Sequence, residues 1–305
     1  MPELPDVTIY IEALQRRVMG HTLHRVRLAS PFLLRTFEPP LDAAFGKKVI
    51  GIHRIGKRIV LELEDQLFVV IHLMIAGRLR WTDSAASLDG KAPEKEQKIP
   101  GKIGLASFHF STGVLVMTEA GSKRRASLHV ISGRQQLEAL DPGGSEVSLM
   151  SVKDFGEALR KENHTVKRVL TDPKLFSGIG NAYSDEILHR ARISPLKLTQ
   201  SFSDEEVMRL LSAANGVLRE WTQRLREETG EGFPARVTAF RPEMAVHGKF
   251  GQPCPDCGSP VQRIVYADNE TNYCARCQTG GKVLADRALS RLLKSDWPRS
   301  IDDLE

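Results

Sequence analysis

The four cysteines of this 305-residue chain lie in one short segment, and their spacing points to a specific chemistry. Cys254 and Cys257 form one pair, and Cys274 and Cys277 form a second pair after sixteen intervening residues. Each C-x2-C pair can hold one side of a tetrahedral ion, and the residues between can form a hairpin that brings the pairs together. Four thiolates close the coordination sphere of zinc, so the spacing predicts one structural zinc ion. A redox pair or an iron–sulfur site explains the two matched pairs less well.

The N-terminal sequence MPELPD places a proline and a carboxylate directly after the initiating methionine. Because Pro2 is small, we expect Met1 to be removed, which would expose a secondary amine. An α-amino group has a pKa of about 8, so part of it is unprotonated at neutral pH and can attack an electrophilic carbon to form an iminium. Glu3 would then act as general acid or base. The same residues also suit a stiff start to a helix, and the motif alone favours that simpler interpretation.

The segment SGIGNAYSDEIL, residues 177–188, joins two stretches of helical pattern through two glycines. Gly178 and Gly180 permit turn geometry, and Asn181 is predicted to cap the helix that follows. The N-terminus of a helix offers backbone N–H groups to a phosphate. An ordinary turn between helices also explains the segment, and the segment alone favours that interpretation.

The balance of charge and hydropathy narrows the class of protein. Lys and Arg outnumber Asp and Glu by 43 to 38, which only weakly favours a polyanionic partner. Lys123, Arg124 and Arg125 lie together in GSKRRAS, which by itself indicates a solvated loop more than a binding site. The sequence shows no apolar run of membrane-spanning length and no signal-peptide pattern. We therefore expect an intracellular protein of the cytoplasm or nucleoid that does not use a membrane.

The hydrophobic pattern predicts the elements that position these residues. Residues 6–18 have the spacing of an amphipathic helix, and a region of short, β-branched segments follows. Strands are predicted at 21–30, 47–56, 58–64, 67–73, 77–81, 105–110 and 114–118, with tight turns at Asp65–Gln66 and 111–113. Many short strands separated by turns indicate a sandwich or barrel. The polar stretch 82–103 is predicted to be a surface loop.

From about residue 150 the periodicity becomes helical. Helices are predicted at 152–162, 164–172, 182–192 and 203–228, and Ser203 with Glu206 has the pattern of a capping box. Pro195 is expected to end the third helical region, and Gly230 and Gly232 the fourth. The predicted organisation is a β-sandwich domain over 1–130, a helical domain over 150–235, a zinc finger over 245–281 and an extension over 282–305 with one further helix.

Together these motifs resemble the formamidopyrimidine-DNA glycosylase and endonuclease VIII family of base-excision repair enzymes. MPELPD resembles the family's N-terminal PELPE motif, GKRIVLEL (56–63) its lysine-bearing strand start, and IHLMIAGRL (71–79) its HLGMSG-type segment. Residues 167–188 resemble its helix–two-turn–helix element, and the cysteine segment resembles its C-terminal zinc finger. The resemblance covers about residues 1–280, with the motifs in the family's order.

The resemblance implies an α+β multidomain fold: a helix-led β-sandwich, a helix–two-turn–helix domain and a zinc-finger β-hairpin. The implied partner is double-stranded or locally single-stranded damaged DNA, bound by a monomer. The damaged nucleotide would leave the duplex, the Pro2 amine would attack the deoxyribose anomeric carbon, and Glu3 would protonate the ring oxygen. Lys57 would contact phosphate and assist β-elimination. The positions that hold the DNA backbone in the family correspond to His72, Lys167 and Asn181.

The chain departs from the family pattern in four places. Asn269 stands five residues before the third cysteine, where the family usually carries an arginine that grips phosphate and assists δ-elimination. A neutral amide lacks that charged, bidentate group. Ile75 replaces the methionine that fills the space left by the flipped base, and Asp6 replaces a glutamate. Residues 118–128 replace the loop that supplies the other wedge residues, so that Lys123, Arg124 and Arg125 are present without an aromatic partner.

Three functions are compatible with this sequence. The leading hypothesis is a glycosylase with AP lyase activity that ends at β-elimination and acts on non-standard lesions, such as single-stranded, bulky or cross-linked damage. The second is an AP lyase with weak glycosylase activity. The third is a damaged-DNA-binding protein without catalysis. The intact Pro2, Glu3 and Lys57 disfavour the third, because a pure binding protein needs no free N-terminal amine.

Overall fold

The computed structural model describes residues 1–83, 99–121, 123–235, 237–266, 269–285, 292 and 298–304. The chain forms two compact units, which we call the N-terminal unit and the C-terminal unit. The N-terminal unit comprises Met1–Pro142 and Trp221–Val237, and the C-terminal unit comprises Gly143–Glu220 and Thr238–Glu305. Most of the predicted loop 82–103, and most of the helix predicted within 282–305, lie outside the described residues.

The N-terminal unit begins with helix α1 (Leu4–Val18), which starts two residues earlier than the hydrophobic pattern predicts. A capping box accounts for the earlier start. The Glu3 backbone N–H donates to Asp6 Oδ2 at 3.0 Å, while the Glu3 carboxylate accepts from the Asp6 N–H. Pro5 fits the first turn of the helix, because backbone N–H groups there have no acceptor within the helix and the missing N–H of proline costs no hydrogen bond. The first turn therefore fixes both carboxylates of the N-terminal motif.

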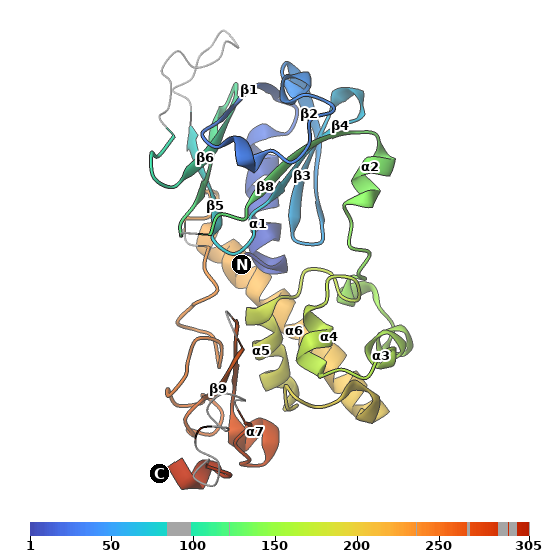
Figure 1. Ribbon diagram of the computed structural model, residues 1–305, viewed down its shortest axis with the longest axis vertical. Coiled ribbons are helices and arrows are strands. Elements are labelled where there is room, and N and C mark those ends of the chain that lie inside the picture. Colours follow the sequence, from blue (N-terminus) through green and yellow to red (C-terminus); the bar gives the residue numbers. More distant parts are fainter. Residues whose placement is uncertain are drawn as a thin grey trace. The chain divides into compact units, whose positions relative to one another are not determined.

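Eight antiparallel strands form one sheet in the order β5-β7-β6-β1-β2-β3-β4-β8 (Figure 1). The strands are β1 (Thr22–Leu28), β2 (Lys47–Ile55), β3 (Arg58–Leu63), β4 (Leu67–His72), β5 (Gly77–Asp83), β6 (Gly104–Phe110), β7 (Gly113–Glu119) and β8 (Ser127–Ser132). Both halves of the sheet bury side chains in one core with α1, among them Val69 from β4, Phe108 from β6 and Tyr10 from the helix. This shared core confirms the predicted helix-led β-sandwich.

Strand β8 and helix α2 (Arg134–Ala139) lie beyond the last strand that the sequence predicts. Strand β8 pairs with the whole of β4, and α2 covers the opposite face of the sheet, where Leu137 packs with Val60, Phe68 and Val70 (Figure 1). The six residues of β8 are too few to show a clear alternation of apolar and polar side chains. The strand is stabilised by its pairing with β4, which the sequence pattern does not reveal. The N-terminal unit therefore continues past residue 130 to Pro142.

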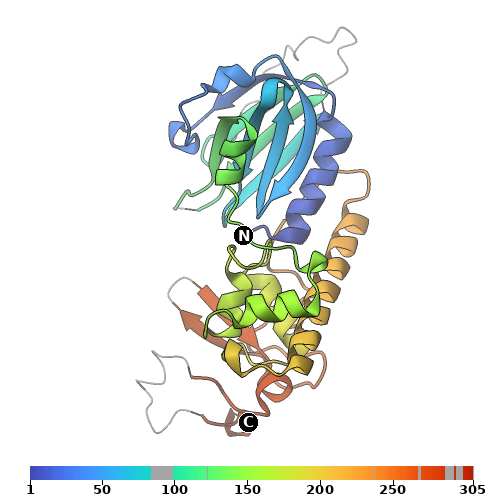
Figure 2. The same ribbon diagram turned by 90° about the vertical axis from the view of Figure 1, so that its right-hand side faces the viewer.

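Helices dominate the first part of the C-terminal unit: α3 (Val152–Arg160), α4 (Val166–Thr171), α5 (Asn181–Ala191) and the long α6 (Asp204–Thr229), which are labelled in Figure 1 and drawn from a second side in Figure 2. The residues of α6 from Trp221 onward belong to the N-terminal unit. The predicted capping box starts α6, since the Ser203 N–H donates to Glu206 Oε2 at 2.9 Å and the Glu206 N–H donates to Ser203 Oγ at 3.2 Å. The prediction that Asn181 caps α5 was wrong. Gly180 occupies the cap, and Asn181 is the first helical residue, which frees its side chain for another contact.

The zinc-finger region contains a hairpin of β9 (Gln262–Tyr266) and β10 (Asn269–Tyr273), followed by helix α7 (Ala275–Thr279). Residues beyond the finger fold back onto it. Leu284 and Ile301 share a core with Ile264 and Tyr273, and the Leu284 N–H donates to the Tyr273 hydroxyl at 2.7 Å. The described parts of 282–305 therefore complete the core of the finger.

Candidate active site and metal centre

The N-terminus of the chain lies in a desolvated part of the N-terminal unit. Pro2 is buried and Glu3 is 2% exposed. Burial lowers the pKa of the Met1 α-ammonium group; the Glu3 carboxylate opposes this shift, and the charges of Arg78 and Lys57 add to it. The fold therefore gathers the three residues predicted to be catalytic, and it adds Arg78, which the sequence alone did not single out.

Lys57 lies in the tight turn between β2 and β3. Gly56 makes this turn possible because its φ of +55° is a left-handed conformation that other residues rarely adopt. Burial lowers the pKa of the Lys57 ammonium group, and the Glu3 carboxylate acts in the opposite direction. Within the described part of the chain, Lys57 Nζ has no hydrogen bond or ion pair. All its N–H donors are therefore available to an anion such as phosphate.

His72 ends strand β4, where it pairs with Arg58 on β3 and Ser127 on β8. Burial and the positive charges of Arg58, Lys57 and His129 lower the pKa of His72 to about 4. The imidazole is therefore neutral at physiological pH, so it can donate one hydrogen bond to a phosphate oxygen but contributes no charge.

Two further basic residues near His72, Arg58 and His129, were missed by the sequence analysis, as was Arg35, which lies near His129. Burial, followed by the charges of Arg58 and Arg35, lowers the pKa of His129. The Arg35 N–H donates to Leu128 O at 2.9 Å, which holds Arg35 beside strand β8. The signal for Arg58 and His129 exists only in the pairing of β3, β4 and β8, which no single segment of sequence reveals. Arg58 therefore adds positive charge near both histidines, Arg35 adds it near His129, and the lowered pKa favours the neutral form of His129.

Ile75 lies in the turn between β4 and β5 and is 56% exposed. Arg78 braces this turn, since its Nη1 donates to Ile75 O at 3.2 Å and to Gly77 O at 2.7 Å. A Cβ at Gly77 would lie 2.2 Å from Leu73 O, so only glycine fits at the end of the turn. The turn therefore presents an apolar side chain to solvent from a rigid support.

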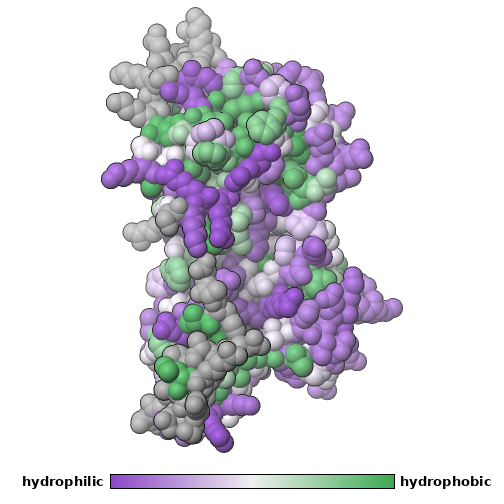
Figure 3. Space-filling model, viewed as in Figure 1, coloured by the Kyte–Doolittle hydropathy of each residue, from purple (hydrophilic) through white to green (hydrophobic). Residues whose placement is uncertain are grey.

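Lys123, Arg124 and Arg125 are all exposed, and they lie just before β8. The buried carboxylate of Glu119 anchors the end of their loop by accepting from the Arg125 N–H at 3.0 Å and the Ala126 N–H at 3.1 Å. Figure 3 shows long hydrophilic side chains that project from the N-terminal unit beside an apolar area. Arg124 Nη2 also donates to Lys102 O, so the loop that carries the three exposed cations is held at Arg124 as well as at its end.

Lys167 of α4 is held inside the C-terminal unit. Its Nζ donates to Asn181 O and to Ser184 Oγ, each at 3.0 Å, and to Asp185 Oδ1 at 2.5 Å. Its side chain is only 12% exposed, and that of Asp185 is fully buried. All three N–H donors of the ammonium group are thus used by groups of the chain itself.

Asn181 and Asn269 are brought to the same part of the C-terminal unit through Glu270. Asn181 Nδ2 donates to Glu270 O at 2.8 Å, which ties the start of α5 to the start of β10. Asn269 precedes Glu270 and is exposed. The Glu270 carboxylate accepts from Arg263 Nη1 at 3.3 Å and Asn272 Nδ2 at 2.7 Å. A carboxylate therefore follows the position where the family pattern has a cation.

A buried polar network on α5 was also missed by the sequence analysis. His247 Nδ1 is 2.8 Å from Asp185 Oδ2, and the His247 ring stacks on Phe240 with centroids 5.6 Å apart. Glu186 accepts from the backbone N–H groups of Val246 and His247, each at 2.9 Å. Two adjacent acidic residues in the middle of a helical pattern were the available signal. Their partners lie about sixty residues away, beyond the reach of local pattern analysis.

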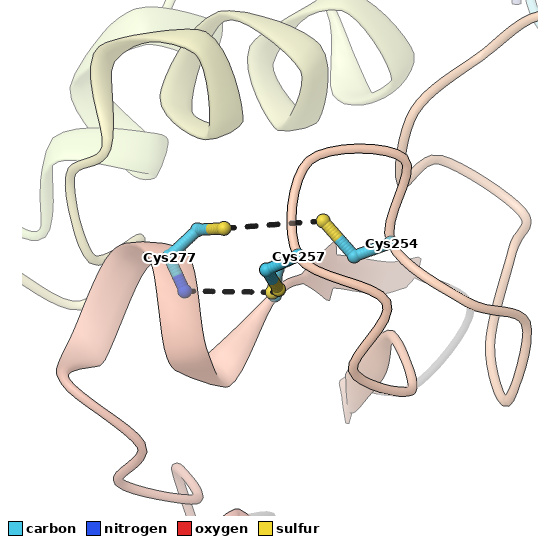
Figure 4. A group of neighbouring side chains, drawn as sticks. Cys254, Cys257 and Cys277 are labelled. Atoms are coloured by element: carbon cyan, nitrogen blue, oxygen red, sulfur yellow. Dashed lines mark hydrogen bonds between the residues drawn. The ribbon is translucent and has the colours of Figure 1, made fainter.

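The four cysteines converge as the spacing predicts. Figure 4 shows Cys254 and Cys257 on a loop and Cys277 on α7, with their sulfurs turned toward one another. Cys254 Sγ lies 3.9 Å from Cys277 Sγ, Cys257 Sγ lies 3.4 Å from Cys274 Sγ, and all four sulfurs are within 4.8 Å of one another. A zinc ion with Zn–S bonds of about 2.3 Å separates its sulfurs by about 3.8 Å. The four cysteines therefore fit one structural zinc ion.

Among the described residues, no helix is long and apolar enough to cross a membrane.

Three family descriptions match consecutive parts of the chain. The formamidopyrimidine-DNA glycosylase N-terminal domain matches residues 1–123, and the formamidopyrimidine-DNA glycosylase H2TH domain matches residues 140–229. A zinc finger found in FPG and IleRS matches residues 251–280. The three matches follow one another in chain order.

Curated relatives match over nearly the whole chain. The formamidopyrimidine-DNA glycosylase of Heliobacterium modesticaldum is 32% identical over 293 residues, covering 91% of this chain and 100% of the relative. That of Thermus thermophilus is 30% identical over 295 residues, covering 92% of this chain and 100% of the relative. An uncharacterized formamidopyrimidine-DNA glycosylase-like protein of Mycobacterium tuberculosis is 41% identical over 164 residues, covering 54% of this chain and 100% of the relative.

Solved structures of the Lactococcus lactis enzyme have the same fold. Its complex with DNA containing an abasic site gives a TM-score of 0.75 at 26% identity, covering 91% of this chain and 99% of that chain. Its complex with DNA containing Fapy-dG gives a TM-score of 0.76 at 26% identity, covering 91% of this chain and 100% of that chain. Fold, domain order, zinc ligands and sequence identity agree, and the chain belongs to the formamidopyrimidine-DNA glycosylase family of base-excision repair DNA glycosylases.

Proposed function

We propose that this protein is a bifunctional DNA glycosylase and AP lyase that uses the amine of Pro2 as its nucleophile. The observation that carries the proposal is that Pro2 is buried beside Glu3, at a terminus where the charges of Glu3, Arg78 and Lys57 all act on the Met1 ammonium group. Met1 must be removed first, because a retained Met1 would make the Pro2 nitrogen an amide without a nucleophilic lone pair.

The reaction would proceed in four steps. The unprotonated Pro2 nitrogen attacks C1′ of the deoxyribose, and the bond from C1′ to the damaged base breaks with its electron pair leaving on the base. The Pro2 nitrogen then loses its proton to the departing base or to water. The sugar ring opens as Glu3 donates a proton to O4′, and the electron pair of the nitrogen replaces the broken C1′–O4′ bond, which leaves an iminium between C1′ and Pro2. Loss of a C2′ proton breaks the C3′–O3′ bond and releases the 5′-phosphate end. Water finally hydrolyses the iminium and frees the amine.

The electrostatics of the site suit this sequence of steps. Burial lowers the pKa of the Met1 ammonium group. Pro2 is buried as well, so we expect the same desolvation to favour the unprotonated, nucleophilic form of the amine that removal of Met1 exposes. Lys57 has no internal partner among the described residues and can stabilise the phosphate that leaves during β-elimination. His72 can donate a hydrogen bond to the same backbone while remaining neutral.

We further propose that strand cleavage stops after β-elimination. The position where the family pattern has an arginine is the exposed Asn269, and the neighbouring carboxylate of Glu270 is paired with Arg263. A neutral amide beside a carboxylate attracts a phosphate far less than a guanidinium group does. The product would therefore carry an unsaturated aldehyde at its 3′ end rather than a 3′-phosphate.

The altered wedge positions favour non-standard lesions. Exposed Ile75, braced by Arg78, can fill the space left by a flipped base, and the cationic loop at Lys123–Arg125 supplies positive charge without an aromatic wedge. A protein that forces a duplex open less strongly gains most from DNA that is already open. We therefore propose single-stranded, bulky or cross-linked damage as substrate, bound by a monomer.

Trapping with sodium borohydride tests the nucleophile. The zinc-loaded protein is incubated with an abasic-site oligonucleotide and borohydride, which reduces the iminium to a stable covalent adduct. We expect an adduct for the wild-type chain and a weaker adduct in Pro2→Gly, because glycine replaces the secondary amine with a primary amine that forms a Schiff base less readily in this site. The matched control is wild-type protein carrying one added residue before Pro2, which turns the nitrogen into an amide and leaves every side chain in place. An equal adduct from this extended protein would overturn the assignment of the amine.

Two alternatives remain distinguishable in the same assay. An AP lyase with weak glycosylase activity is favoured by the loss of the family arginine at Asn269, and it would trap abasic DNA while leaving damaged bases in place. A damaged-DNA-binding protein would retard lesion-bearing DNA without any adduct. Electrophoresis of the cleaved strand tests the β-elimination proposal, and a 3′-phosphate product would contradict it.

A further inference from the structure

Helix α5 is fastened to the zinc-finger region at several points along its length. Asn181 at its start donates to Glu270 O at 2.8 Å, and Glu186 in its middle accepts from the backbone N–H of Val246 at 2.9 Å. Just past its end, Ile193 O accepts from Gln278 Nε2 at 2.9 Å. These contacts place the side of α5 against the polypeptide that carries the cysteines.

One residue of α5, His189, reaches the metal centre itself. Its Nε2 lies 3.3 Å from Cys254 Sγ, and His189 is 4% exposed. The nearest carboxylate oxygen, Asp256 Oδ2, is 4.0 Å from the same nitrogen, which is beyond hydrogen-bond distance. Because a zinc-bound cysteine is a thiolate and can only accept, the His189 nitrogen that faces it must carry the hydrogen.

We propose that His189 is a positioning residue for the metal centre, which donates an Nε2–H···S hydrogen bond to the Cys254 thiolate and so makes zinc retention depend on helix α5. Four thiolates around one Zn²⁺ leave a net negative charge, and part of it is buried because Cys254 is 3% exposed. A donor aimed at that sulfur stabilises the charge and fixes the direction of the ligand.

A second donor to the centre comes from the finger itself. The Cys277 N–H donates to Cys274 Sγ at 3.5 Å, a backbone contact within one turn of α7. The His189 contact differs because it comes from a different element, 65 residues before Cys254. Loss of zinc would remove the thiolate acceptor and weaken this link between the finger and the helix that starts at Asn181. The inference concerns the metal centre and holds whether or not the proposed Pro2 chemistry is correct.

Zinc release from the full-length protein tests the proposal. The zinc-loaded wild type, His189→Phe and His189→Gln are mixed with excess chelator, and release is followed with a chromogenic zinc indicator. Phenylalanine keeps a planar ring but has no donor, so release should accelerate by about 10-fold. Glutamine can place an amide N–H near the position of Nε2, so its rate should stay close to that of the wild type. His164→Phe is the matched control, because His164 pairs with Glu162 on the surface of the same unit.

A second measurement needs no variant. When zinc is replaced by ¹¹³Cd in the wild-type chain, the hydrogen on His189 Nε2 should show a scalar coupling to the metal through the N–H···S–Cd path. With Co²⁺ in the site, the sulfur-to-metal charge-transfer band should move to longer wavelength in His189→Phe, because the sulfur lone pair is no longer stabilised, and not in His189→Gln.

The outcomes separate hydrogen bonding from packing. Absence of the ¹¹³Cd coupling would overturn the proposal even if His189→Phe failed to fold. Equal acceleration in His189→Phe and His189→Gln would also overturn it, because both change the packing but only one loses the donor. Fast release from His189→Phe alone, with the charge-transfer shift, supports it.

Discussion

Lys57 and Lys167, two lysines predicted to hold DNA, lie in contrasting surroundings. Lys57, in the N-terminal unit, is desolvated and has no hydrogen bond or ion pair among the described residues, so burial lowers the pKa of its ammonium group. Lys167, in the C-terminal unit, donates to three oxygens, one of them from the buried carboxylate of Asp185. The first lysine is prepared for an external anion, whereas the second is fully engaged within the fold.

The contrast extends to the neighbours of each lysine. Around Lys57 the fold adds positive charge from Arg78 and Arg58, which act on the terminal amine and on His72. At the hairpin of the C-terminal unit, Asn269 is neutral, and the negative charge of Glu270 is paired with the positive charge of Arg263. An ammonium left without an internal partner costs stability unless a ligand compensates it, so such a residue marks a functional site more reliably than a satisfied one. We therefore expect the chemistry to be concentrated in the N-terminal unit.

The largest expected effect tests the chemistry of that unit. In Glu3→Gln the amide oxygen can still accept the Asp6 N–H, so helix α1 should start as before. Loss of the general acid should slow base release and strand cleavage by about 10²–10⁴-fold in single-turnover assays. Glu12→Gln is the control, because Glu12 lies on the same helix and pairs with Arg226 at 2.7 Å. A wild-type rate in Glu3→Gln would assign the proton transfer to another group.

The next effect tests whether Lys167 is structural. Asp185→Asn would leave the Lys167 ammonium group without its counter-charge and would also change the contact of Asp185 with His247, so the free energy of unfolding should fall by about 3–5 kcal/mol. Thermal or denaturant unfolding of the zinc-loaded protein measures this loss. Glu220→Gln breaks the exposed pair with Arg190 and should cost roughly 0–1 kcal/mol. Equal losses in the two variants would show that the buried pair is not special.

The sequence predicts features that depend on the type and order of nearby residues. The cysteine pairs met as their spacing required, and Ser203 with Glu206 formed the expected capping box. The tight turn at Asp65–Gln66 was also correct, with φ of +60° and +56° at the two residues. Each of these features depends on residues that are close together in the sequence or on a characteristic spacing of ligands. Both can be read directly from the order of the residues.

Features that depend on a distant partner could not be predicted in this way. The sequence marks Lys167 as a cation, but only the fold shows that Asp185 and Ser184 use its donors. Likewise, His189 is an ordinary residue of a helical pattern until the fold places Cys254 at its Nε2. These tertiary contacts decide whether a charged side chain is available to bind a ligand or is already paired within the protein. The sequence therefore identifies candidate binding residues, and the structure shows which of them are already paired.

A smaller effect is expected from restoring a cation at the hairpin. Asn269→Arg places a guanidinium group at an exposed position that precedes Glu270. Binding to abasic DNA should tighten by about 10-fold, and its salt dependence should steepen by about one phosphate contact. Gln200→Arg adds the same charge at another exposed position of the C-terminal unit. If both variants bind abasic DNA equally well, the gain in affinity reflects the added net charge. The neutral side chain at position 269 would then not be what limits binding of the DNA backbone.

The smallest effect is a shift in pH dependence at the N-terminus. Burial lowers the pKa of the Met1 ammonium group, and we expect the buried Pro2 amine that replaces it to be shifted in the same direction. Borohydride trapping should therefore rise with pH, with a midpoint below that of the same amine when it is exposed to solvent. The positive charge of Lys57 also disfavours the protonated amine, so Lys57→Met should move the midpoint to higher pH. Lys48→Met removes an exposed cation that does not act on the amine and should leave the midpoint unchanged. A midpoint that moves to lower pH in Lys57→Met would show that the two groups do not interact as the fold indicates. In that case the charge of Lys57 would not act on the terminal amine, and the difference between Lys57 and Lys167 would lie only in their hydrogen bonds.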